Sequence, residues 1–329
     1  MGSDSSPKSG RSRTLFTIFC IGMVVGGFLV AEVSNGVGPN DCNAHFPLLN
    51  PRWRCDTDDP PKRQEYDELK KTLVDDINTW QKKGRASFVS VYFRNLQNGS
   101  AFGIHTNERF APASLLKTPV MIALLKYAES HPEILNEKIA MGNNIPGSAN
   151  VFDPQKTLVA GQTYTVREIL RRMIVYSDNI SKDVLLRRLE AASPGILDQT
   201  FIDMGVSLQG PDGAQFITVR AYASLFRTLY NASYLSRESS QMALDLLSQS
   251  EFPRGIVAGV PKGIIVAQKF GYLDIDPKAQ QLHNCGIVYA PTNYLLCVMT
   301  RGNSPDAIAD VIAGVSREVY TEVARKDAE

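Results

Sequence analysis

The chain has 329 residues, of which 43 % are hydrophobic and 21 % are charged. This composition is typical of globular proteins and excludes disorder throughout. Lysine and arginine together number 35 against 34 acidic residues, and the formal charge of +1 provides no global field for nucleic acid. No nucleic-acid partner is expected, and the substrate must be recognised in a local site.

The N-terminus has the pattern of a membrane anchor. Residues 1–13 are polar and basic, and residues 14–31 are uncharged and mostly apolar. At about 1.5 Å per residue, such a run is long enough to cross a bilayer, and basic residues before it are retained in the cytoplasm. We predict a cytoplasmic tail over 1–13 and a single-pass signal anchor over 14–33. The alternative is a cleaved signal peptide, for which the run is long.

This orientation places the remainder of the chain in an extracytoplasmic space, such as a bacterial cell envelope. Residues 34–62 are rich in Asn, Pro and Asp and are predicted to be a linker. Residues 63–329 are predicted to be one folded domain. It begins with a helix in "YDELKKTLVDDINTW", followed by a hairpin of "ASFVSVYFRN" and "SAFGIH" joined by "LQNG".

Helical patterns fill the middle of this domain and strand patterns return near its end. Thr165 and Glu168 form a capping box before "ILRRMIVY". Further helices are predicted at "DVLLRRLEAA", "TVRAYASLFRTLY" and "SSQMALDLLSQ", strands at "GIIVAQKFGY", "HNCGIVYA" and "NYLLCVMTRG", and a last helix after Ser304. Strands at both ends predict an α/β fold of the α+β type, with one antiparallel sheet flanked by helices and an inserted helical lobe.

The stretch "APASLLKTPVMIALLKYA" (111–128) places Ser114 and Lys117 three residues apart in an apolar helix. One reading is that Ser114 caps the helix and Lys117 extends to solvent. The other is a nucleophile and its base, one helical turn apart. The spacing alone is not diagnostic, because Ser5 and Lys8 show it too.

Two further triplets follow in order: Ser177-Asp178-Asn179 between two predicted helices, and Lys269-Phe270-Gly271 at the end of a predicted strand. S-x-x-K, S-D-N and a K-T-G-like triplet are the signature of class A β-lactamases and penicillin-binding proteins. From about residue 66 to 325, the sequence resembles this superfamily of active-site serine hydrolases. In isolation, Ser177 and Asn179 would be helix caps, Asp178 a structural residue and Lys269 a solvated strand end.

The chemistry of these residue types agrees with the resemblance. An amine whose pKa is lowered by burial is able to deprotonate Ser114, and Lys117 is placed to be that base. Ser177, supported by Lys269, is placed to protonate the leaving nitrogen. The resemblance further implies substrate binding by Asn179, Gly271 and Tyr272, and an oxyanion hole formed by the backbone N–H groups of Ser114 and Tyr272.

Two departures from the family pattern bear on the reaction. Phe270 occupies the position of a Thr or Ser and is unable to hydrogen-bond a substrate carboxylate. Class A enzymes also carry a loop Glu that activates water for deacylation, whereas "GVSLQGPDGAQF" contains only the acid Asp212. Asp183 is a possible substitute, although a surface acid beside Lys182 is the simpler interpretation.

The cysteine and histidine content limits other chemistry. Neither a metal nor another cofactor is predicted, because the sequence lacks CxxC and HExxH and has only four His. Cys42 and Cys55 bracket a loop in which an oxidising compartment permits a bridge. The pairing of Cys285 with Cys297 depends on strand register and is left open.

Three functions are therefore considered. The first is a membrane-anchored, β-lactamase-like serine hydrolase that opens a β-lactam or D-Ala-type amide through an acyl-serine, with slow deacylation. The second is a D-alanyl-D-alanine carboxypeptidase or transpeptidase acting on peptidoglycan stem peptides. The third is a non-catalytic binding domain of the same fold.

Overall fold

The computed structural model describes residues 46–50, 65–143, 154–208, 214–274 and 279–328. The predicted tail, the anchor, most of the linker, Cys42, Cys55 and Asp212 lie outside these ranges. Every helix within them is too short or too polar to cross a bilayer. The predicted linker includes residues 46–50, but Leu48 and Leu49 are buried against the domain. Leu48 O accepts a hydrogen bond there from Tyr289 Oη at 2.9 Å.

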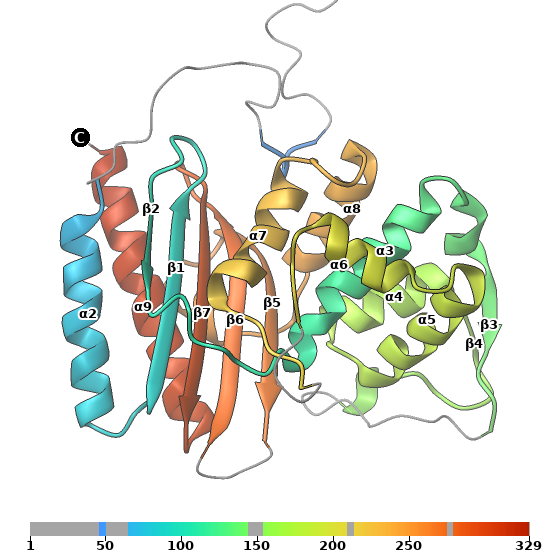
Figure 1. Cartoon of the computed structure of the whole chain (residues 1–329), viewed down its shortest axis with the longest axis horizontal. Coiled ribbons are helices and arrows are strands. Elements are labelled where there is room, and N and C mark those ends of the chain that lie inside the picture. The colour runs from blue at the N-terminus through green and yellow to red at the C-terminus, as the bar shows by residue number, and fades with distance from the viewer. Residues whose placement is uncertain (1–45, 51–64, 144–153, 209–213, 275–278, 329) are drawn as a thin grey trace, which may run out of the picture. The chain divides into compact units, whose positions relative to one another are not determined.

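One antiparallel sheet is built from both ends of the domain, as predicted (Figure 1). Its order is β2-β1-β7-β6-β5, so that β5 is an edge strand. β1 pairs with β2 and with the last strand, β7. β7 is buried along nearly its whole length, because core clusters cover both faces of the sheet. The strands are β1 (Phe88–Asn95), β2 (Ala101–Ile104), β5 (Ile265–Leu273), β6 (Gln280–Tyr289) and β7 (Tyr294–Gly302).

Two helices from opposite ends of the domain cover one face of the sheet (Figure 1). α2 (Asp67–Lys82) presents Leu69, Leu73 and Ile77, one helical turn apart, to this core. α9 (Pro305–Asp327) begins after Ser304, whose Oγ accepts a hydrogen bond from Ala307 N. Both predicted helices are confirmed.

The inserted helical lobe lies between β2 and β5 in the sequence, and α7 and α8 cover the second face of the sheet (Figure 1). The capping box before α4 is confirmed, as are the helices predicted after it. α6 and the small β3–β4 sheet were not predicted, and the three-residue strands of that sheet are too short for a periodic signal. The elements are α3 (Lys117–Ala128), β3 (Lys138–Ala140), β4 (Thr163–Thr165), α4 (Val166–Val175), α5 (Asn179–Ala192), α6 (Ile196–Asp203), α7 (Val219–Tyr230) and α8 (Arg237–Ser248).

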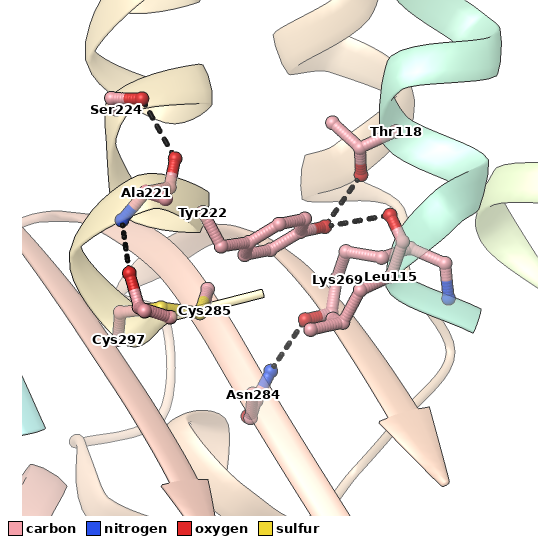
Figure 2. Close-up of a disulfide and its surroundings, with 10 residues drawn as sticks. Leu115, Thr118, Ala221, Tyr222, Ser224, Lys269, Asn284, Cys285 and Cys297 are labelled. Atoms are coloured by element: carbon pink, nitrogen blue, oxygen red, sulfur yellow. Dashed lines mark hydrogen bonds between the residues drawn. A yellow bond between two sulfur atoms is a disulfide. The ribbon is translucent and has the colours of Figure 1, made fainter. Parts of the chain in front are cut away.

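A disulfide joins two of the strands at the centre of the domain (Figure 2). Cys285 of β6 and Cys297 of β7 lie directly opposite each other in the antiparallel register. Both side chains are fully buried. The register of β6 and β7, which the sequence alone left open, therefore permits this bridge.

Candidate active site

Ser114 lies in a tight turn at the boundary between the sheet and the helical lobe. The turn is a 3₁₀ helix, η1 (Ala113–Leu116), which runs directly into α3 at Lys117. Ser114 therefore precedes the α-helix proper instead of beginning it. Neither η1 nor α3 has a side-chain N-cap, so the interpretation of Ser114 as a helix cap is wrong. Lys117 is only 1 % exposed, so it does not extend to solvent.

A glycine lets the edge strand approach this turn closely. A Cβ on Gly271 would lie 3.0 Å from both Pro112 O and Leu115 Cγ, which is tighter than ordinary packing allows. Any larger residue at position 271 would push η1 away from β5. Glycine is therefore required at position 271 for a structural reason, because a side chain there would increase the distance between β5 and the serine turn.

Two buried side chains, neither predicted from the sequence, hydrogen-bond backbone carbonyl groups within this turn and just before it. His283 of β6 donates from Nε2 to Ala111 O at 3.1 Å, and burial lowers the pKa of its ring to about 3. Tyr222 of α7 donates to Leu115 O at 3.2 Å and contacts Thr118 Oγ1 at 2.8 Å (Figure 2). Both residues lie in ordinary apolar patterns, so no sequence signal distinguishes them from core residues.

The second triplet occupies the break between α4 and α5, as predicted. Asp178 is the N-cap of α5, and its carboxylate accepts hydrogen bonds from Ser181 N at 2.8 Å and Thr157 Oγ1 at 2.6 Å. The interpretation of Asp178 as a structural residue is therefore confirmed, since it caps α5 and holds Thr157. Ser177 adopts a φ of 57°, a left-handed conformation that is costly for a non-glycine residue and is held here by its surroundings.

Lys117 connects the first two triplets. Its Nζ lies 2.8 Å from Ser114 Oγ and 3.2 Å from Ser177 Oγ. It also lies 2.6 Å from both Ser177 O and Asn179 Oδ1. The four contacts fix the amine between the serine of η1 and the loop before α5.

The environment of Lys117 favours a neutral amine. Burial, and secondarily the positive charge of Lys182, lower its pKa to about 7, against the opposing effects of Asp178 and Asp183. A neutral amine has two hydrogens and one lone pair. The two oxygens at 2.6 Å, Ser177 O and Asn179 Oδ1, can only accept and take both hydrogens. The lone pair is then left to accept the hydroxyl proton of Ser114.

Lys269 approaches the same site from the sheet. Its side chain is fully buried, so the interpretation as a solvated strand end is wrong. Its Nζ donates to Ser177 Oγ at 2.9 Å and to Phe270 O at 3.0 Å. Burial, together with the nearby Lys117, lowers the pKa of Lys269 well below its ordinary value. Both lysines therefore contact the same hydroxyl oxygen, Ser177 Oγ.

The structure thus brings together four of the predicted residues through direct contacts: Ser114, Lys117, Ser177 and Lys269. Asn179 is in the same network, with its Oδ1 engaged by Lys117. Gly271 and Tyr272 lie on the edge strand β5, against which η1 packs. The oxyanion-hole role of the Ser114 and Tyr272 N–H groups stays a prediction.

Phe270, which departs from the family pattern, and Asp183, the possible substitute for the loop Glu, make contacts outside the hydrogen-bond network of Lys117. Phe270 is 2 % exposed and stacks on Phe252, with ring centroids 4.1 Å apart. Asp183 lies 3.0 Å from Lys182, which agrees with its simpler interpretation as a paired surface acid. Within the described part of the chain, the hydrogen-bond partners of Lys117 are Ser114, Ser177 and Asn179, and no Glu side chain is among them to serve as a second base.

The fold and this site define a β-lactamase-like serine hydrolase. The chain belongs to the beta-lactamase enzyme family, whose family model matches residues 71–323. A beta-lactamase of Citrobacter koseri is 24 % identical over 177 residues, which cover 50 % of this chain and 59 % of that protein. The aligned part is thus less than two thirds of the relative.

Solved structures agree in fold. A mutant of PBP-A, in an acyl-enzyme complex with penicillin G, is 23 % identical, with a TM-score of 0.66 over 81 % of this chain and 99 % of that one. A beta-lactamase from Chitinophaga pinensis is 20 % identical, with a TM-score of 0.66 over 77 % and 99 % of the two chains. The TLA-1 extended-spectrum beta-lactamase is 17 % identical, with a TM-score of 0.66 over 77 % and 98 %.

Proposed function

We propose that the protein is an acyl-serine enzyme that opens a β-lactam or a related D-Ala-type amide, with Ser114 as the nucleophile and Lys117 as its base. The observation that carries this proposal is the hydrogen bonding of Lys117. Its Nζ lies 2.6 Å from two oxygens that only accept, Ser177 O and Asn179 Oδ1, and 2.8 Å from Ser114 Oγ. A neutral amine that donates to the first two would have its lone pair available for the hydroxyl group of Ser114. This is the arrangement in which a neutral amine activates a hydroxyl group.

In the proposed acylation, the proton lost by Ser114 is matched by one delivered to the leaving nitrogen. Ser114 Oγ attacks the carbonyl carbon while its proton moves to Lys117 Nζ. The negative oxygen that forms would be stabilised by the N–H groups of Ser114 and Tyr272, each worth about 3 kcal/mol. Ser177 donates its hydroxyl proton to the leaving nitrogen as the C–N bond breaks, and regains a proton from Lys117, 3.2 Å away.

A D-alanyl-D-alanine carboxypeptidase or transpeptidase is the second candidate. It is favoured by "GVSLQGPDGAQF", which contains no Glu to activate water. Slow hydrolysis of the acyl-enzyme is tolerable when a peptide amine accepts the acyl group. The third candidate, a non-catalytic binding domain, is disfavoured by the intact contacts among Ser114, Lys117 and Ser177.

Replacing Ser114 with alanine tests the nucleophile. Ser114→Ala should abolish labelling by a fluorophosphonate, because it removes the oxygen that forms the covalent bond. The measurement is in-gel fluorescence of purified wild type and variant. Ser224→Ala is a matched control, since Ser224 lies on α7 and bonds only Ala221 O, at 2.7 Å, among the described residues. Undiminished labelling of Ser114→Ala would refute the assignment.

We also propose that residues 14–33 anchor the protein with its hydrolase domain outside the cytoplasmic membrane. Lys8, Arg11 and Arg13 before the apolar run support this orientation. The Cys285–Cys297 disulfide suits an oxidising compartment. Protease added to spheroplasts should remove the domain and leave the anchor in the membrane. Full protection of the domain, with cleavage only after lysis, would contradict this orientation.

A further inference from the structure

A separate pocket of about 480 Å³ adjoins the proposed catalytic site and is not used by the mechanism above. The β5 residues of its lining alternate with Lys269 along the strand, and Lys269 Nζ reaches to 4.2 Å from the centroid of the Phe270 ring. Phe270 and Tyr272 of β5 line it, together with Phe252 and the first turn of α9. It is therefore built by the residue that replaces the family's Thr or Ser.

Apolar side chains form most of its wall. Phe252 and Phe270 stack with an interplanar angle of 15°, and Leu282 and Ala309 complete the inner surface. Phe252 and Phe270 are 5 % and 2 % exposed. An apolar group placed against them would leave water at about 25 cal/mol per Å² of area buried.

The charged residues of the lining do not offer an unpaired cation. Arg254 is the one cationic residue in the lining, and its guanidinium donates to the Asp306 carboxylate and, at 3.2 Å, to Asp306 O. A second carboxylate, that of Asp310, lies 3.9 Å from the same group. Glu251 is the remaining charged lining residue. The Glu251 carboxylate in turn lies 3.8 Å from Lys156 Nζ. The charged groups of the lining are thus paired with one another or with neighbours, and none is a free cation for a carboxylate that would have to leave water.

The pocket lies near the two residues that are proposed to act on the leaving group. Tyr176, which precedes Ser177, lines it, and Lys269 Nζ lies 4.2 Å from the centroid of the Phe270 ring. Ser177 and Lys269 are the groups proposed to protonate the leaving atom. A substituent on the leaving group would therefore extend toward this pocket, whereas the acyl group stays on Ser114.

Resting on the proposed acyl-serine function, we propose that this pocket receives an uncharged, apolar substituent of the leaving group. The protein then selects neutral amides and esters over those that carry a carboxylate on this side of the scissile bond. In the reaction the acyl group transfers to Ser114 Oγ, the bond to the leaving oxygen or nitrogen breaks, and that atom takes a proton from Ser177. β-Lactams and D-Ala-type amides, which carry a carboxylate there, would still acylate Ser114, but with a lower kcat/KM than neutral amides and esters of the same acyl group.

The test compares two phenylacetyl esters, one of 3-methylphenol and one of 3-hydroxybenzoic acid. Their leaving phenols have similar basicity and differ in one charge. We expect wild type to release 3-methylphenol with a kcat/KM about tenfold higher or more, the size typical of discrimination by an apolar pocket. Phe270→Thr, which introduces a hydroxyl group, should reduce this ratio several-fold, whereas the matched control Phe270→Leu should retain most of it. A ratio measured on one variant cancels any general loss of activity.

Arg254→Leu tests whether Arg254 recognises a substrate carboxylate. If Arg254 bound a carboxylate, this variant would lose activity toward the 3-hydroxybenzoate ester alone; the proposal expects the preference for the neutral ester to persist. Equal rates for the two esters in wild type, or a preference for the carboxylate, would overturn the proposal while leaving acylation of Ser114 intact. If mass spectrometry found Ser114 unmodified by both esters and by penicillin G, the proposed function itself would fail, and the pocket assignment with it.

Discussion

Lys117→Met should lower the rate of acylation by penicillin G about 10²–10⁴-fold, the usual cost of losing a general base. Methionine fills the buried space but has no lone pair basic enough to take the proton of Ser114. The rate is measured by quenching at successive times and determining the acylated fraction by intact mass. Lys126→Met is the matched control on the same helix, because Lys126 is partly exposed and pairs with Glu129. Near wild-type acylation by Lys117→Met would show that another group is the base.

The same assignment predicts a pH dependence with a definite sign. Burial lowers the pKa of Lys117 to about 7, so that the amine is protonated below this pH and neutral above it. Only the neutral form accepts a proton, and the acylation rate should therefore rise as pH increases through about 7 and then level off. A rate that falls over this range would contradict the role of Lys117.

The acyl-enzyme formed with penicillin G should persist. The stretch 205–216 offers no Glu, and the one acid found near Lys117 on α5, Asp183, is paired with Lys182 at 3.0 Å. Without a base to activate water, hydrolysis of the ester should be about 10²–10⁴-fold slower than with one. A chromogenic cephalosporin should give a burst near one equivalent of product and then a slow phase. Rapid linear turnover without a burst would show that a base is present.

Two substitutions would then identify that base. Asp183→Asn and Asp212→Asn each remove one candidate carboxylate with little change of shape. Asp198→Asn is the control, since Asp198 is exposed on α6. If either variant abolishes the turnover that wild type shows, while the control does not, the missing acid is identified.

The sheet, the helices around it and the three triplets could be predicted because each depends on local signals. Amphipathic periodicity predicts α2 and α7, and the capping box predicts the start of α4. The disulfide could not be predicted, since a shift of one residue in strand register would separate Cys285 from Cys297.

The protonation states of the site also lie beyond the sequence. The burial of Lys117 and Lys269 depends on packing between the helical lobe and β5, which no local pattern encodes. The same holds for His283 and Tyr222, which fix the serine turn by hydrogen bonds across more than 100 residues of sequence. Phe270 could be recognised as a departure from the pattern, but its stacking on Phe252 required the fold.

The most direct test of the central claim is intact-mass analysis after incubation with penicillin G, followed by peptide mapping of the adduct. The account predicts a mass increase of one penicillin per chain, mapped to Ser114, that declines slowly after free penicillin is removed. An unmodified chain, or an adduct on any residue other than Ser114, would contradict it.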